Sequence, residues 1–302
     1  MTPYDEIDVP VPGGCLRVVR WPGAGPVVVA AHGITSNALA WSQVAEHLAG
    51  AAVTLVAPDL RGRAGSRAAP PPYGIGTHAD DLVAVLDALD VPSAVLAGHS
   101  MGAFVAAVAA ARHPGRVSHV VLVDGGVGFP APVGSDVDAV LEAVLGPAMR
   151  RLGMTFGSPE AYLDFWREHP ALRAVWTPTV EAHLRRDLVE HDGGWRSSCV
   201  LDAVRIDGRE VLEDTETLAA APGLRVPATL LWAERGLLDE PQGLYDEARV
   251  DQAALPPVVR AVAVPDVNHY SIVLGSSGAE AVAEELVRVA SDGDRGARTR
   301  AG

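Results

Sequence analysis

Residues 98–102 read Gly-His-Ser-Met-Gly and follow directly on the apolar run at residues 94–97. A strand that enters a G-x-S-x-G segment and continues into a helix makes a tight turn with the serine at its tip. Gly98 and Gly102 are the small residues that such a turn requires. Ser100 would then stand at a helix N-terminus, where the helix dipole and backbone N–H groups stabilise negative charge. The pattern predicts that Ser100 is a nucleophile for acyl transfer.

Residues 31–35, Ala-His-Gly-Ile-Thr, stand at the predicted C-terminal end of another apolar strand. A small turn at this place can present a backbone N–H group to an oxyanion. Together with the N–H of the residue after the serine, the expected oxyanion donors are Ile34 and Met101. Without the serine motif, the His-Gly pair would indicate only a turn at a strand end.

His269 is the predicted base. A serine hydroxyl needs a base with a pKa near neutrality within hydrogen-bond reach. The chain has ten histidines, but His269 follows the last predicted strand, at the sheet edge from which Ser100 also emerges. His99 lies inside the serine motif, and we expect it to be a packed neighbour that points away from the serine hydroxyl. Asn268 is expected to brace the His269 loop.

An imidazole that accepts the serine proton needs a carboxylate that fixes its tautomer and stabilises its charged form. Two predicted strand ends carry suitable residues. Asp124 follows the strand after the serine motif, whereas Glu234 and Asp239 follow a later strand. Position along the chain leaves all three as candidates.

Apolar strands alternate with helical patterns around these motifs. Strands are predicted at residues 15–21, 26–31, 53–57, 93–97, 117–123, 228–232 and 258–264, and helices at residues 41–48, 80–89, 103–112 and 279–289. Near-continuous apolar strands separated by helices predict an α/β fold with a parallel sheet covered on both faces.

The alternation of strands and helices stops between residues 130 and 220, where helical patterns at 136–151, 159–169 and 179–191 occur without a convincing strand. We therefore predict an α/β core at residues 1–129 and 221–290, a helical cap at 130–220 and a disordered tail at 291–302. The cap holds six of the fifteen aromatic residues. Most of them should pack the cap onto the sheet edge, whereas Trp166 and Trp176 are candidates to line an apolar substrate pocket.

Four motifs together make the chain resemble the capped serine esterases and C–C hydrolases of the α/β-hydrolase fold superfamily. They are His32-Gly33, residues 58–62 (Pro-Asp-Leu-Arg-Gly), residues 98–102 and Asn268-His269. The resemblance covers about residues 8–290 and implies a mostly parallel eight-stranded sheet with helices on both faces and an inserted helical cap.

Residues 58–66 are expected to be structural, with an Asp–Arg pair that braces the loop beside the active site. This segment is not a phosphate-binding loop, because it lacks the G-x-x-x-x-G-K pattern. Contact of Arg61 with substrate is the less favoured alternative.

The resemblance also bears on the choice of acid. In many relatives the acid is an Asp in a W-G-E-R-D-like segment after the later strand. This chain reads Trp-Ala-Glu-Arg-Gly at residues 232–236, so Gly236 takes that place. Macrolide-lactone hydrolases such as the zearalenone hydrolases instead use an acid after the strand that follows the serine motif. Asp124 matches that position, and we favour it over Asp239 and Glu234.

The composition of the 302 residues excludes several other functions. A net charge of −14 argues against a nucleic-acid partner, which would need a basic surface. The N-terminus lacks the features of a signal peptide, and no run approaches the roughly 20 apolar residues of a membrane span. We therefore expect a cytoplasmic protein without a membrane partner. Cys15 and Cys199 do not imply a disulfide.

No cluster of residues has metal-ligand spacing, and we expect neither a metal nor another cofactor. A homodimer is compatible with the sequence, which does not determine the oligomeric state.

These patterns predict a serine hydrolase in which Ser100, His269 and Asp124 cleave a small apolar carboxylic ester or lactone through an acyl-enzyme. A serine at the turn argues against haloalkane dehalogenase and epoxide hydrolase chemistry, whose relatives carry Asp there. The close alternative is a C–C bond hydrolase of ring-cleavage products that uses the same triad. A different alternative is a ligand-binding protein or receptor of this fold with little turnover.

Overall fold

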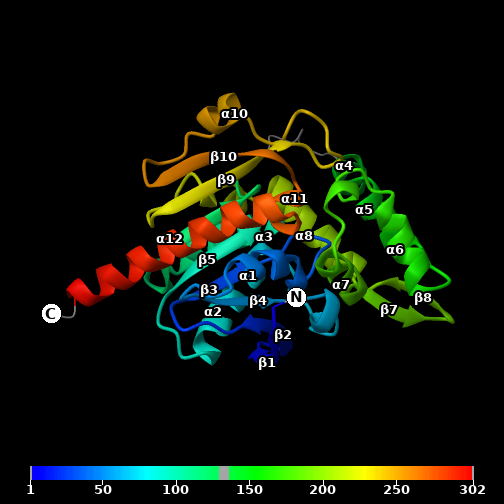
Figure 1. Ribbon diagram of the computed structural model, residues 1–302, viewed down its shortest axis with the longest axis horizontal. Helices are drawn as coiled ribbons and strands as arrows, with labels where there is room; N and C mark the ends of the chain where they lie inside the picture. Colours follow the sequence, from blue (N-terminus) through cyan, green and yellow to red (C-terminus); the bar gives the residue numbers. More distant parts are fainter. Residues whose placement is uncertain (1, 129–135, 301–302) are drawn as a thin grey trace.

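The computed structural model describes residues 2–128 and 136–300 and contains an eight-stranded sheet (Figure 1). Its strands are β1 (Asp5–Val11), β2 (Gly14–Trp21), β3 (Val27–Ala31), β4 (Thr54–Pro58), β5 (Ala94–His99), β6 (Val117–Val123), β9 (Ala228–Arg235) and β10 (Val259–Asn268). The order across the sheet is β1-β2-β4-β3-β5-β6-β9-β10. The pairs β1–β2 and β2–β4 are antiparallel, and all the other neighbours are parallel. The predicted α/β fold with a mostly parallel sheet is confirmed.

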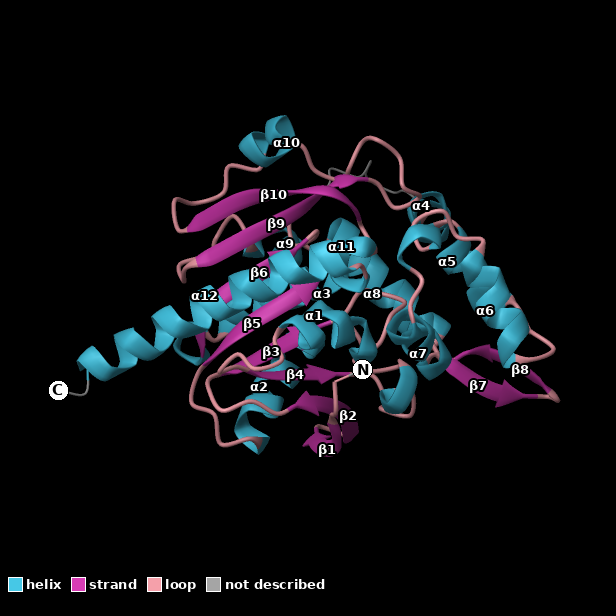
Figure 2. Cartoon of the chain, in the orientation of Figure 1, coloured by secondary structure: helices cyan, strands magenta, loops and turns pink. Residues whose placement is uncertain are grey.

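Helices cover both faces of this sheet (Figure 2). On one face α1 (Ser42–His47), α11 (Ser271–Leu274) and α12 (Ser276–Arg300) pack together, and on the other α2 (Ile75–Ala88), α3 (Met101–Arg112) and α9 (Thr215–Ala220) do so. The short helix α10 (Glu247–Gln252) precedes β10. Helix α3 consists mainly of Ala and Val and is buried over most of its length against β3, β5 and β6. No helix in the described ranges is long and apolar enough to cross a membrane.

The strand order reverses its direction between β3 and β5. Strand β4 lies on one side of β3, and β5, the next strand along the chain, lies on the other. In open α/β sheets such a reversal leaves a crevice outside the carboxyl ends of the strands, where ligands bind. The segments that leave β3 and β5 at this point carry Ile34 and Ser100. The topology thus places the loop after β3 that carries Ile34, which we call the oxyanion loop, beside the predicted nucleophile Ser100.

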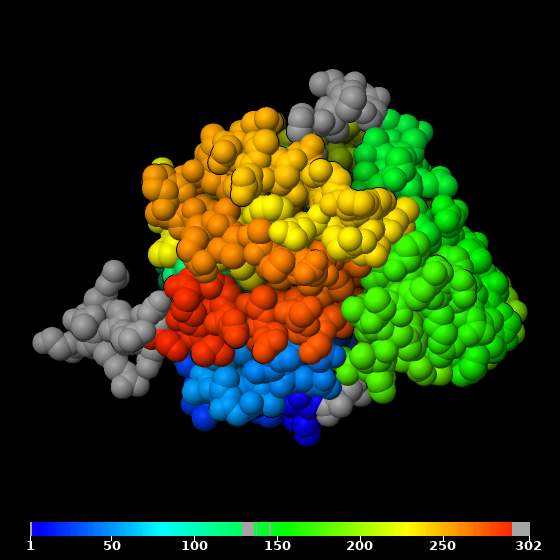
Figure 3. Space-filling model, turned by 45° about the horizontal axis from the view of Figure 1, so that its top comes forward, coloured from blue at the N-terminus to red at the C-terminus, as the bar shows by residue number. Residues whose placement is uncertain are grey.

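Between β6 and β9 the chain leaves the sheet and forms a mainly helical segment, which we call the inserted segment (residues 136–213). It contains α4 (Val137–Leu145), α5 (Pro147–Arg150), α6 (Pro159–Arg167), α7 (Pro178–Arg186), β7 (Leu188–His191), β8 (Gly194–Ser197) and α8 (Leu201–Glu213). It lies at the edge of the sheet toward which the arrow of β5 points (Figure 1). Figure 3 shows this green segment packed against the yellow and orange surface of the later strands and loops.

The inserted segment ends before the predicted cap boundary at residue 220, because α9 packs against α3 of the core. Residues 129–135, where the cap was predicted to start, lie outside the described residues.

The prediction of a purely helical insertion is wrong at residues 188–197. Helix α7 ends at Arg186, and β7 and β8 form an antiparallel hairpin where the helix was expected to continue to residue 191. Asp192 and Gly193 join the two strands with φ angles of 49° and 76°. An Asp-Gly pair with two positive φ angles forms the two-residue turn whose twist matches that of a hairpin.

Both ends of the chain also differ from the sequence-based expectation. Strand β1 adds an edge strand in which Ile7, Val9 and Val11 alternate with exposed residues, the period expected of a half-buried strand. At the other end, the backbone of α12 is helical as far as Arg300, where a disordered tail was expected from residue 291. No proline interrupts this stretch, so none forces the helix to end within it. Residues 301–302 of the predicted tail lie outside the described residues.

Candidate active site

Ser100 lies at the turn between β5 and α3, with φ 56° and ψ −122°. A positive φ is uncommon for a residue other than glycine and is often found at functional sites. A Cβ atom on Gly98 would lie 1.9 Å from the carbonyl oxygen of Gly102, and one on Gly125 would lie 2.2 Å from that of Ser100. The turn therefore needs glycine at these positions. Met101, the second predicted oxyanion donor, is the first residue of α3, where N–H groups lack a partner within the helix.

His269 and Asp124 form a direct hydrogen bond, with 2.6 Å between Nδ1 of the imidazole and Oδ2 of the carboxylate. His269 follows β10, Asp124 follows β6, and both side chains are buried. The other carboxylate oxygen accepts a hydrogen bond from Ala233 N at 2.9 Å. Because an ionised carboxylate can only accept, Nδ1 of His269 carries the hydrogen and Nε2 is left to accept a proton. The structure brings the predicted base and acid together.

The two alternative acids are engaged elsewhere. Asp239 accepts a hydrogen bond from Arg235 at 2.8 Å, and this guanidinium lowers the pKa of the Asp239 carboxyl. Glu234 is exposed, and its carboxylate accepts from Asp266 N at 3.3 Å. Of the three candidate acids, Asp124 is the one that is hydrogen-bonded to His269.

The loop after β3 presents Ile34 beside Ser100. A Cβ atom on Gly33 would lie 3.3 Å from Cβ of Ser100, so the loop approaches the serine closely. The carbonyl of Gly33 accepts from His32 Nδ1 at 2.8 Å and from Ser36 N at 3.1 Å. Because a trans peptide bond is planar, the N–H of Ile34 points away from this held carbonyl. The two bonds to Gly33 O thus hold the Ile34 N–H in one direction.

His32 is a neutral imidazole with a fixed tautomer. Its Nε2 accepts a hydrogen bond from Leu60 N at 3.0 Å, so the hydrogen is on Nδ1 and is donated to Gly33 O. Complete burial lowers the pKa of His32 well below its ordinary value. The side chain of His32 thus fixes the carbonyl of Gly33 in the loop after β3 and does not carry a proton.

His99 contacts the predicted base, as expected of a packed neighbour. Its Nε2 donates to the backbone carbonyl of His269 at 2.8 Å, and the two ring centroids are 4.7 Å apart. Burial, reinforced by His269, lowers the pKa of His99 well below its ordinary value. His99 is therefore a neutral residue that holds the His269 loop. On the same loop, Asn268 Oδ1 accepts from Ser271 N at 2.8 Å, the bracing role predicted for it.

Two cavities meet at Ser100, and both are bounded by Ile34, Ser100 and His269. The larger has a volume of about 360 Å³ and the smaller about 50 Å³. Apolar side chains line most of the larger one: Met101, Phe104, Val140, Leu141, Val144, Val211, Leu212, Leu237 and Leu244. The smaller is lined by more polar residues, among them Asn37, Arg151, Tyr162, His183 and Asp187.

The structure separates the two tryptophans that were predicted to line a pocket. Trp166 lines the smaller cavity, with its ring centroid 5.0 Å from Cζ of Arg151. Trp176 lies in a groove on the outside of the inserted segment, where Arg167 stacks on its ring at 4.9 Å. The prediction for Trp176 is wrong, because this residue lies just before α7 and lines neither cavity at Ser100.

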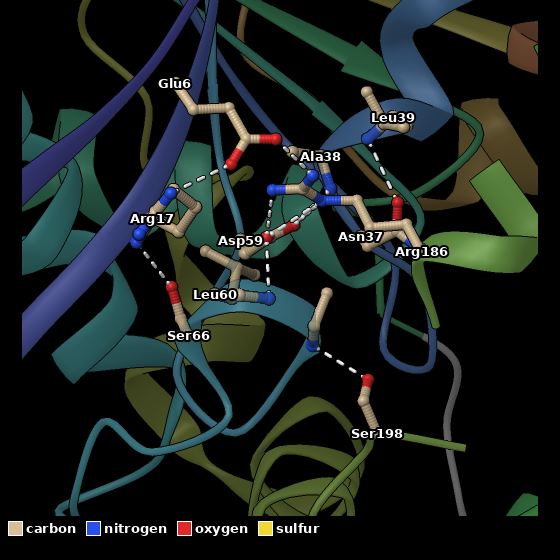
Figure 4. Close-up of polar contacts among 12 residues, drawn as sticks. Glu6, Arg17, Asn37, Ala38, Leu39, Asp59, Leu60, Ser66, Arg186 and Ser198 are labelled. Atoms are coloured by element: carbon tan, nitrogen blue, oxygen red, sulfur yellow. Dashed lines mark hydrogen bonds and ion pairs between the residues drawn. The ribbon is translucent and has the colours of Figure 1, made fainter. Parts of the chain in front are cut away.

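The Asp–Arg pair predicted within residues 58–66 is replaced by pairs with other segments. Asp59 binds Arg186 of α7 at 2.8 Å and also accepts from Ala38 N at 2.8 Å (Figure 4). Arg61 forms a buried two-point pair with Asp81 at 2.6 and 2.8 Å and does not line either cavity at Ser100. The bracing role is retained, but it joins this loop to the inserted segment and to α2.

A family model described as alpha/beta hydrolase fold matches residues 26–276. The chain belongs to this family. It is a hydrolase of the α/β fold, as the motifs predicted.

Curated relatives cover most of this hydrolase. It is 29% identical to an N-formylmaleamate deformylase of Pseudomonas putida over 83% of this chain and 84% of the relative. It is 28% identical to a 2-(acetamidomethylene)succinate hydrolase of Mesorhizobium japonicum, again over 83% and 84%. A crystal structure of an E-2-(acetamidomethylene)succinate hydrolase matches with a TM-score of 0.75 and 23% identity over 95% of this chain and 99% of that one. At that identity the structural likeness shows the fold alone.

Sequence reasoning missed the buried charges of the hydrolase around the oxyanion loop. Arg151, directly after α5, donates to Thr35 O at 2.6 Å and to Asp187 at 3.0 Å. Tyr162 donates to the same carboxylate at 2.5 Å. Burial and the neighbouring Asp187 raise the pKa of Tyr162. These partners are far apart in the sequence and follow no periodic pattern, so no local signal could have identified them.

Proposed function

We propose that this hydrolase cleaves carboxylic esters or lactones through an acyl-enzyme on Ser100. The observation that carries the proposal is the buried 2.6 Å bond between His269 and Asp124, beside two cavities that His269 and Ser100 both line. This is the set of residues that nucleophilic acyl transfer requires, each on the end of its own strand.

In the proposed reaction, Ser100 Oγ attacks the substrate carbonyl and His269 Nε2 takes its proton. Asp124 holds the imidazole tautomer and stabilises the cation. The N–H groups of Ile34 and Met101 stabilise the oxyanion, each by about 3 kcal/mol. His269 then protonates the leaving alcohol and afterwards activates the water that releases the acid.

The larger cavity favours a substrate with an apolar group. Apart from Ser100, its polar lining side chains are already paired with protein atoms: Asp124 with His269, Tyr245 with Val127 O at 2.9 Å and Arg249 with Leu244 O at 2.6 Å. Its volume of about 360 Å³ falls in the range of small-molecule sites. We propose that the inserted segment acts as a cap, because α4 and α8 supply much of this lining.

Hydrolysis of an acyl–nitrogen bond is the second candidate, favoured by the relatives. Their names contain N-formyl and acetamido groups, both of which are acyl groups on nitrogen. The same triad and oxyanion donors would serve this reaction. The smaller cavity, about 50 Å³, has room for one or two water-sized groups and so suits a small acyl substituent.

The test compares 4-nitrophenyl acetate with 4-nitroacetanilide, which differ in the atom that leaves the acyl group. The proposal predicts release of 4-nitrophenol by the wild type, its loss in Ser100→Ala, and slower release of 4-nitroaniline. Faster cleavage of the anilide would favour the second candidate. Turnover of neither compound would count against both and would favour a C–C bond hydrolase or a binding protein.

A further inference from the structure

Arg63 lies in the loop after β4 and is completely buried. Its Nε and Nη2 both donate to the carbonyl of Ile34, at 3.0 and 2.9 Å. Its Nη1 donates to the carbonyl of Arg61 at 2.8 Å. A guanidinium is a rigid planar fork, so two bonds to one carbonyl hold the Ile34–Thr35 peptide in a single orientation.

The peptide on the other side of Ile34 is held as well, because Gly33 O accepts from His32 and from Ser36. The N–H of Ile34 lies in the plane of this Gly33–Ile34 peptide, and the Ile34–Thr35 peptide that Arg63 holds is joined to it at the Cα atom of Ile34. Arg63 therefore completes the constraint on Ile34, which bounds both cavities at Ser100.

The charge of Arg63 is compensated from the inserted segment. Nη1 of Arg63 lies 2.5 Å from Oδ2 of Asp207, on α8, and both side chains are inaccessible to solvent. The same carboxylate accepts from His78 Nε2 at 3.0 Å and from Gly74 N at 2.8 Å. A buried guanidinium without its partner would be strongly unfavourable. Asp207 thus keeps Arg63 in place.

We propose that Arg63 and Asp207 are positioning residues for the oxyanion donor Ile34. The inference rests on the proposed acyl transfer at Ser100. In this arrangement the docking of α8 completes the oxyanion hole. The next residue of α8, Gly208, lines the larger cavity, so the helix that contacts the substrate also supports the oxyanion donor.

A purely structural ion pair would stabilise the fold without acting on the transition state. The chain offers a matched control in Arg61, from the same loop, and Asp81, on α2, a similarly buried pair with bonds of 2.6 and 2.8 Å. The remaining side-chain bonds of Arg61 go to Pro12 O and Pro70 O, and neither reaches the oxyanion loop. Breaking either pair should destabilise the protein, but only the loss of the Arg63–Asp207 pair should disturb Ile34.

The experiment measures kcat, KM and the melting temperature of Asp207→Asn, Arg63→Lys and Asp81→Asn with 4-nitrophenyl acetate. Oxyanion stabilisation acts in the transition state, so its loss lowers kcat with little change in KM. Asp207→Asn is expected to lower kcat by about 30-fold or more with KM within about threefold. Arg63→Lys should give an intermediate kcat, because an ammonium restores the charge but not the two-point bond. Asp81→Asn should lower the melting temperature and keep kcat within about threefold.

The inference is overturned if Asp207→Asn and Asp81→Asn change kcat alike, or if Arg63→Lys retains the wild-type kcat. If Asp207→Asn does not fold, Arg63→Lys, which keeps the buried charge, still tests the inference through its kcat. If the wild type shows no turnover that is lost in Ser100→Ala, the result contradicts the proposed function itself.

Discussion

Asp124 follows β6 and bonds His269, which follows β10, although β9 lies between these two strands in the sheet. The end of β9 takes part in the arrangement, since Ala233 N donates to the second oxygen of Asp124. The Asp124 carboxylate therefore extends past the end of β9 to the imidazole of His269. The same strand holds the carboxylate through the N–H of Ala233. This geometry explains how the acid can come from the strand after the serine turn.

Replacing Asp124 tests this assignment. Asp124→Asn should lower kcat for 4-nitrophenyl acetate by about 10³-fold or more, because the amide no longer fixes the His269 tautomer. Asp239→Asn and Glu234→Gln are the controls and should stay close to the wild type. The assignment would be refuted by near-normal turnover of Asp124→Asn together with a loss in either control.

The serine turn should tolerate no side chain at residue 98. Gly98→Ala would place a Cβ atom 1.9 Å from the carbonyl oxygen of Gly102, so the backbone of the turn must shift. We expect a loss of about 1–3 kcal/mol in the free energy of unfolding, measured by urea denaturation, and a large loss of activity. Gly115→Ala is the control, because its Cβ atom would meet nothing within 4 Å. Equal effects of the two substitutions would contradict the close-contact argument.

Acid should destabilise the protein through buried neutral histidines. Burial lowers the pKa of His183 to about 4, and its Nδ1 is hydrogen-bonded to Asn37 Oδ1 at 3.1 Å. Between pH 6.5 and 4 the unfolded chain binds a proton that the folded protein does not, so the free energy of unfolding falls as the pH falls through this window. At pH 5 the loss is about 2 kcal/mol for this residue.

His183→Gln should therefore show a smaller drop in melting temperature between pH 7 and pH 5 than the wild type. His191→Gln, whose side chain is 40% exposed, is the control and should keep the wild-type drop. Identical drops in all three proteins would exclude His183 as a source of the acid sensitivity.

The unequal cavities predict a preference for unequal esters. Octyl acetate, methyl nonanoate and butyl hexanoate share one molecular formula but place their carbon atoms differently about the ester. Only the first two combine a small group for the cavity of about 50 Å³ with a long apolar group for that of about 360 Å³. One of them should exceed butyl hexanoate by about tenfold or more in kcat/KM.

Val211→Trp should reduce that preference by filling the larger cavity, whereas Ile206→Trp on the exposed side of α8 should not. The proposed use of the cavities is wrong if butyl hexanoate is the best of the three substrates.

The strand-end motifs made much of this site predictable. Parallel strands gather their carboxyl ends at one edge, so Ser100, His269 and Asp124 could be assigned to neighbouring positions before their contacts were known. The Asp-Gly turn of the β7–β8 hairpin was a local signal that the helical interpretation overlooked. The pairing of Arg63 with Asp207 has no such signal, because it depends on how α8 docks on the loop after β4.

Covalent labelling with a fluorophosphonate, read by intact-protein and peptide mass spectrometry, tests the central claim most directly. The wild type should gain one adduct, located on Ser100, and Ser100→Ala should gain none. His269→Gln should label far more slowly, because Ser100 loses its base. A wild-type protein that stays unlabelled, or one that is labelled at another residue, would contradict the assignment of Ser100 as the nucleophile.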